Sequence, residues 1–181
     1  MQSPTPRVPQ QPAATRTELD ARLTVELASV VAGARRRALR DGDRQTDTAH
    51  LLHSLIESDP EVRTVVGDAP QVARVLGYLV QRSIGYGLRW QGSVEDSGTV
   101  PVVRGADADV SRWSPSAVTA MEGALQRADL RGDARVRGID LLACLAVDRE
   151  SRAVEVLGRA GVDAALLAGR IAEMSRHVSQ G

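Results

Sequence analysis

Apolar residues recur every three to four positions through most of the chain, which is the spacing of one face of an α-helix. The first such segment covers residues 23–40 and is expected to end at the turn "DGD", residues 41–43. A second, shorter helix is expected at about residues 49–57. Two more follow "DP" at 59–60 and "DAP" at 68–70, where an aspartate N-cap precedes a proline in the first helical turn. The first half of the chain therefore predicts four consecutive helices.

The same pattern restarts ninety residues later, where Ser114 is a plausible N-cap and Pro115 follows in the first turn. A shift of ninety places residues 23–55 on residues 113–145 without a gap. The shift pairs identical residues along the helices and at the turn: Gly33 with Gly123, Ala34 with Ala124, Arg37 with Arg127, Ala38 with Ala128, Gly42 with Gly132, Leu51 with Leu141, Leu52 with Leu142 and Leu55 with Leu145. Such a repeat predicts two related halves packed with pseudo-two-fold symmetry.

The repeat also divides the chain into segments. Residues 1–16 are rich in Pro and Gln and are expected to form a disordered tail. The first repeat is assigned to residues 17–84 and the second to residues 113–177. Between them, the linker of residues 85–112 contains "LRW" and "TVPVV", which are expected either to pair as a small hairpin or to form a mobile loop.

Composition narrows the fold class. The chain has no Phe, and its aromatic residues are Tyr78, Tyr86, Trp90 and Trp113. Its core must therefore be built from Leu, Val, Ile and Ala, which suits closely packed short helices better than a β-sandwich. The single cysteine, Cys144, rules out an internal disulfide framework and fits a cytoplasmic protein.

Charge and hydropathy exclude several partners. The 23 basic residues balance the 23 acidic ones, so the chain lacks the excess of positive charge that non-specific nucleic-acid binding needs. No apolar stretch reaches the length of a membrane span. The N-terminal segment has no apolar core of a secretory signal, so none is expected.

Two histidines, His50 and His53, share one face of the short helix "DTAHLLHSL". Zinc takes three or four such ligands, and the sequence offers no further one nearby, so we expect no metal site and no cofactor. Their counterparts after the ninety-residue shift are Asp140 and Ala143. We expect His50 to hydrogen-bond near the start of the helix and His53 to be partly exposed.

No catalytic residue is predicted. Cys144 lies in a helix that should be buried, and a buried thiol is usually unreactive. The order of Ser, His and acidic residues along the chain indicates neither a nucleophile with its base nor a carboxylate pair. These observations favour a binding protein over an enzyme.

Several motifs occur once in each repeat. The helix starts are Leu23-Thr24 and Trp113-Ser114-Pro115, the turns are "RDGDRQ" and "RGDARV", and the helices that follow contain "DTAHLLHSL" and "RGIDLLACL". Their order resembles the tandem Clp repeat of the N-terminal domain of the Clp/Hsp100 unfoldases, whose signature is close to "GTEHLLLGL". The resemblance covers about residues 23–176. It implies an all-α fold of two pseudo-two-fold-related four-helix Clp repeats, about eight helices in all.

Two departures from the family bear directly on function. Ala49 and Ile139 stand where the family signature has a glutamate. In the Gram-positive branch those glutamates bind phosphorylated arginine, and a guanidinium without a carboxylate partner loses its paired hydrogen bonds, so we do not expect phosphoarginine binding here. The chain also has no phosphate-loop motif G-x-x-x-x-G-K-[ST] and no Lys, so ATP hydrolysis by the family mechanism is not expected.

The resemblance implies a non-catalytic module that binds proteins or peptides, as an adaptor or substrate receptor linked to Clp protease. Its partners would be clients, the Clp ATPase or peptidase, or cyclic peptide ligands. Alignment with the family places the partner-binding residues at Trp113, Leu23, Val31, Val118 and Glu122.

Two other functions remain open. One is a decoy that sequesters peptides or peptide antibiotics directed at the Clp ATPase N-domain. The other is a structural interaction protein without a Clp link. Trp113 itself either anchors a partner or fixes its own helix to the core, since Trp is enriched in binding hot spots but is also mostly buried in many folds.

Overall fold

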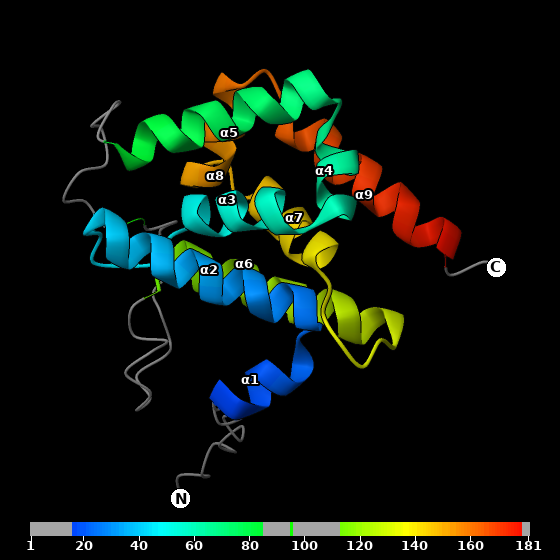
Figure 1. Cartoon of the computed structure of the whole chain (residues 1–181). Coiled ribbons are helices and arrows are strands. Elements are labelled where there is room, and N and C mark those ends of the chain that lie inside the picture. Colours follow the sequence, from blue (N-terminus) through cyan, green and yellow to red (C-terminus); the bar gives the residue numbers. More distant parts are fainter. Residues whose placement is uncertain (1–15, 85–94, 96–112, 179–181) are drawn as a thin grey trace, which may run out of the picture.

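The computed structural model describes residues 16–84, 95 and 113–178, which contain helices and no strand (Figure 1). The first half of the chain forms α1 (Arg16–Arg22), α2 (Val25–Asp41), α3 (Thr48–Ser58), α4 (Pro60–Val66) and α5 (Ala69–Ser83). The second half forms α6 (Pro115–Arg131), α7 (Gly138–Val147), α8 (Arg152–Arg159) and α9 (Ala164–Val178). The predicted all-α class is confirmed. The tail before Arg16 and the hairpin or loop expected in the linker lie outside the described residues.

Matching caps begin and end the long helices of the two repeats. α2 follows Thr24 and α6 follows Ser114, and each hydroxyl accepts the backbone N–H three residues ahead. Both helices have 17 residues and end at a glycine in the left-handed conformation, Gly42 with φ 73° and Gly132 with φ 74°. A side chain is disfavoured in that conformation, so the glycine fixes where each helix stops. The helix starts and the turn predicted from the sequence are confirmed.

Two backbone bridges show how the repeats exchange contacts. Leu23 pairs with Val136 and Thr46 pairs with Trp113, and a shift of ninety converts one pair into the other. Leu23 precedes α2 and Val136 follows α6, whereas Trp113 precedes α6 and Thr46 follows α2. The two long helices therefore run antiparallel (Figure 1). This reciprocity is the pseudo-two-fold symmetry that the repeat predicts.

One core runs through both repeats, with α3 and α7 at its centre and in contact with each other. In Figure 1, α2 and α6 lie on one side of this pair and α5 and α8 on the other. The leucines that the repeat aligns are all fully buried: Leu51, Leu52, Leu55, Leu141, Leu142 and Leu145. Full burial of such a side chain contributes about 1.5–3 kcal/mol. The shared leucines therefore account for a large part of the stability of the core.

α1 was not predicted, because Leu19 is the only large apolar residue within it. Contacts with the second repeat fix the position of this helix. The guanidinium of Arg22 reaches the second repeat, where Nη2 lies 2.5 Å from an Asp129 carboxylate oxygen and Nε donates to the Ala134 carbonyl at 3.3 Å. Among the described helices, none combines the length and apolar character needed to cross a membrane.

Candidate functional site

The five residues predicted to bind partners differ in exposure. Trp113 is 5% exposed and Leu23 is 3% exposed, and Val31 is buried as well. Val118 is half-buried and Glu122 is exposed on α6. Because the bridges that hold Leu23 and Trp113 lie at opposite ends of α2, these two side chains do not line one groove.

The indole of Trp113 packs inward. The guanidinium carbon of Arg35, from α2, lies 5.7 Å from the ring centroid, which is cation–π distance. The indole Nε1 is buried without a hydrogen-bond partner. In this conformation the ring joins the second repeat to α2, and little of it is open to a partner.

An apolar groove of about 220 Å³ lies between α6 and α7. Its lining consists of Thr48, Ser116, Thr119, Ala120, Gly123, Cys144, Leu145, Val147 and Asp148. Val147 is 66% exposed at its edge. At 100° per residue, the groove residues of α6 and the pair Val118 and Glu122 lie on opposite flanks of the helix. Partners can therefore approach α6 from either of two sides.

A buried ion-pair cluster joins the two repeats at the start of α3. Asp47 caps α3 by accepting the His50 N–H at 3.0 Å. Its other oxygen accepts Arg152 Nη1 of α8 at 2.7 Å and also Arg82 Nη2 of α5. Burial alone would raise the pKa of the Asp47 carboxyl, but hydrogen bonding from His50 and the charges of His50 and Arg82 hold it well below its usual range. Asp47 therefore stays ionised and ties three helices together.

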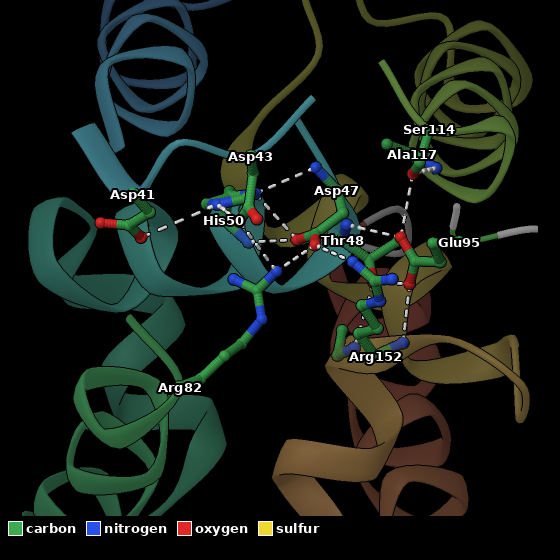
Figure 2. Close-up of polar contacts among 11 residues, drawn as sticks. Asp41, Asp43, Asp47, Thr48, His50, Arg82, Glu95, Ser114, Ala117 and Arg152 are labelled. Carbon is green, nitrogen blue, oxygen red and sulfur yellow. Dashed lines mark hydrogen bonds and ion pairs between the residues drawn. The ribbon is translucent and has the colours of Figure 1, made fainter. Parts of the chain in front are cut away.

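Glu95, from the linker, lies where three helix N-termini converge (Figure 2). Its carboxylate accepts the N–H of Thr48 at the start of α3 at 2.9 Å and the N–H of Arg152 at the start of α8 at 2.7 Å. The hydroxyl of Ser114, the N-cap of α6, donates to it at 2.9 Å, and the Thr48 hydroxyl donates as well. Helix N-termini carry partial positive charge, so this junction suits an anion, and the chain's own Glu95 fills it.

Comparison with known proteins adds structural relatives only. No family model and no curated protein matches the sequence. The fold is similar to that of the N-terminal domain of the caseinolytic protease associated chaperone ClpD from Arabidopsis thaliana, with a TM-score of 0.61 and 19% identity over 86% of this chain and 95% of that chain. The protein has a Clp N-domain-like fold. A chain from a malarial protein secretion system is also similar, with a TM-score of 0.59 and 14% identity over 88% of this chain and 95% of that chain.

Within this Clp N-domain-like fold, the histidines of α3 have different roles. His50 completes a capping box, since its Nδ1 accepts the Asp47 N–H at 3.1 Å, as expected for a residue at the helix start. The expectation that His53 is partly exposed is wrong, because the residue is 4% exposed. α2 covers it: burial and the nearby Arg37 lower the pKa of His53 to about 4.

The remaining titratable candidate, Cys144, is half-buried. Burial raises the pKa of its thiol to about 11, so almost no thiolate forms near neutral pH. The thiol packs against α6, where a Cβ on Gly123 would lie 2.9 Å from the sulfur. This contact explains why a glycine stands there, and it gives Cys144 a packing role.

Sequence reasoning missed the polar junction of the Clp N-domain-like fold. Glu95 lies in a linker without periodicity, and Arg152 is one of 23 basic residues, so neither stood out. The one available signal was Asp47, which aligns with a glycine of the family signature and precedes a helix as an N-cap does. Ala49 is fully buried and Ile139 nearly so, and neither offers a carboxylate.

Proposed function

We propose that this protein is a non-catalytic module that binds proteins or peptides, and that it acts as an adaptor or substrate receptor linked to Clp protease. The observation that carries the proposal is the Clp N-domain-like fold, which extends over 86% of the chain. The chemistry of the site is consistent with it. His50 and Asp47 cap a helix, and burial suppresses the thiolate of Cys144. A module of this kind gains affinity mainly by burying apolar surface.

We place the partner-binding surface on α6. Val118 and Glu122 form its accessible part, whereas Trp113, Leu23 and Val31 lie in the core behind it. The groove on the other flank of α6 offers an apolar recess of about 220 Å³, which is large enough to take part of a peptide. A partner that places one side chain in that recess and also contacts Glu122 would bind both flanks of the helix.

The test compares two charge reversals at exposed glutamates. Glu122→Arg changes the proposed surface, and Glu173→Arg makes the same change on α9. Tagged wild type and both variants are incubated with extract of the native host, and bound proteins are identified by mass spectrometry. We expect wild type and Glu173→Arg to retain the Clp ATPase or peptidase, and Glu122→Arg to lose most of it.

The other outcomes are distinct. If wild type retains neither Clp component, the adaptor proposal is wrong. Peptides bound without any Clp component would point to the decoy function. Equal binding by Glu122→Arg and wild type would remove α6 as the surface. Melting curves of all three proteins establish that lost binding is not lost folding.

A further inference from the structure

The turn between α2 and α3 brings three metal-ligating side chains together. Asp41 ends α2, Asp43 follows in the turn, and His50 lies in the first turn of α3. Each offers one ligand atom, and these atoms lie within 4.8 Å of one another. Figure 2 shows the two carboxylates directed toward the imidazole ring from different sides. The shortage of ligands expected from the sequence therefore does not hold in the folded protein.

In the second repeat, the equivalent turn contains a cationic side chain. A shift of ninety converts Asp41, Asp43 and His50 into Arg131, Asp133 and Asp140. There the guanidinium of Arg131 lies between two carboxylates: it donates to both Asp140 oxygens, at 2.5 and 2.8 Å, and to Asp133 at 2.9 Å. The equivalent turn thus binds a cation that the chain itself supplies.

In the first repeat that arginine is missing from the sequence. The arginine has become Asp41, while the backbone is kept, since Gly42 and Gly132 share the same left-handed conformation. The cationic group at the centre of the turn is thus replaced by a third potential ligand. Arg40 and Arg82 approach from outside, at 3.4 Å from Asp41 and 3.5 Å from Asp43. They offset part of the negative charge, so we expect moderate affinity for a cation.

Two buried polar atoms in the cluster lack hydrogen bonds. They are Oδ2 of Asp41, whose side chain is 7% exposed, and Nε2 of His50, whose side chain is 1% exposed. Nε2 lies 3.0 Å from Asp43 and 3.9 Å from Asp41, so a protonated ring can form an ion pair with them. An unsatisfied buried polar group is costly, so Oδ2 of Asp41, which points into the cluster, indicates a missing partner.

The surroundings of His50 orient it as a ligand. In the structure Nδ1 accepts the Asp47 N–H at 3.1 Å, and it also lies 2.9 Å from Oδ1 of Asp47. When an ion takes the lone pair of Nε2, the ring proton moves to Nδ1, from which it can be donated to that carboxylate. A carboxylate behind the ligating histidine is the usual second layer of a metal site. Asp43, with 37% of its side chain exposed, leaves a route from solvent.

We propose that Asp41, Asp43 and His50 form a binding site for a divalent transition-metal ion such as Zn²⁺, with water completing its coordination. Imidazole nitrogen and carboxylate oxygen are both ligands that zinc binds. Magnesium and calcium prefer oxygen ligands alone, so they bind here more weakly. The ion takes the place that the Arg131 guanidinium has in the second repeat.

The test is calorimetric titration of the full chain with Zn²⁺ after removal of metal by a chelator. Asp43→Asn removes one ligand at a partly exposed position, and Asp133→Asn makes the same change at the matching position of the second repeat. We expect one saturable site in wild type, an affinity lowered by at least about tenfold in Asp43→Asn, and no change in Asp133→Asn. Co²⁺ should give visible d–d absorption bands with wild type and weaker ones with Asp43→Asn.

A second variant separates ligation from folding. The double substitution Asp41→Arg with His50→Asp copies the second repeat into the first, so it should fold and bind no Zn²⁺. Circular dichroism and melting curves check the fold. The proposal is overturned if wild type shows no saturable binding, if Asp43→Asn binds as tightly as wild type, or if Asp133→Asn loses as much affinity.

Discussion

At the scale of single residues, the two repeats place different chemistry at the same position. His53 stands where the second repeat has Ala143, and each is 4% exposed. Alanine has no polar atom to satisfy at this buried position. An imidazole is favoured there in its uncharged form, because burial disfavours charge. Burial and the charge of Arg37 outweigh the attraction of Glu57 and lower the pKa of His53 to about 4.

This shift makes stability depend on pH. In the unfolded chain His53 should titrate near its ordinary value of about 6.5, so between that pH and about 4 the unfolded state takes up a proton that the folded state refuses. The contribution of His53 is complete above the unfolded pKa and is lost as pH falls toward the folded one. We expect wild type to lose about 1–2 kcal/mol more than His53→Gln between about pH 7 and about pH 5. Urea unfolding at both pH values measures this difference, and parallel losses in the two proteins would contradict it.

At the scale of helices, the sequence predicts what is decided locally. The starts of α2, α4, α5 and α6 followed from a Thr, Ser or Asp before the first turn, and each of those side chains does cap its helix. α1 could not be predicted, since Arg22 fixes it to Asp129, more than a hundred residues away.

The polar sites were unpredictable for the same reason. The approach of Asp41 and Asp43 to His50 depends on how the turn folds back, and the place of Glu95 depends on three helices meeting. Neither arrangement produces a recognisable spacing of residue types in the sequence. The burial of His53 likewise comes from the packing of α2 on α3, which the periodicity of α3 alone does not report.

Trp113 precedes α6 and packs against Arg35 of α2, so its main effect should be on helix packing. Trp113→Ala is expected to cost about 3–5 kcal/mol of stability, as other large-to-small core changes do. Leu130→Ala, at an 88% exposed position of α6, is the control and should change stability by less than about 0.5 kcal/mol. Chemical denaturation gives both values. A Trp113→Ala protein as stable as wild type but unable to bind its partner would instead make the indole a binding anchor.

At the scale of the whole molecule, a nearly symmetric fold has an asymmetric interior. At the start of α3, Glu95 accepts hydrogen bonds from both repeats. At the equivalent start of α7 no linker residue is described; the carboxylate of Asp59 packs directly against Gly138, where a side chain would collide with it. The apolar core is shared by the repeats, and Glu95, Asp47 and Arg152 form a buried polar link between them at the start of α3.

Removing the Glu95 carboxylate should therefore weaken the contact between the repeats. Glu95→Ala leaves the N–H groups of Thr48 and Arg152 buried without an acceptor, and hydrogen bonds to a charged group contribute about 1.5–3 kcal/mol each. We expect a loss of at least about 2 kcal/mol, with Glu95→Gln intermediate because its amide keeps one acceptor oxygen. Hydrogen exchange at the Thr48 and Arg152 amides should accelerate together in Glu95→Ala, although these residues belong to different repeats. The exposed Glu173→Ala serves as the control. Unchanged exchange at both amides would show that the helix N-termini do not depend on this carboxylate.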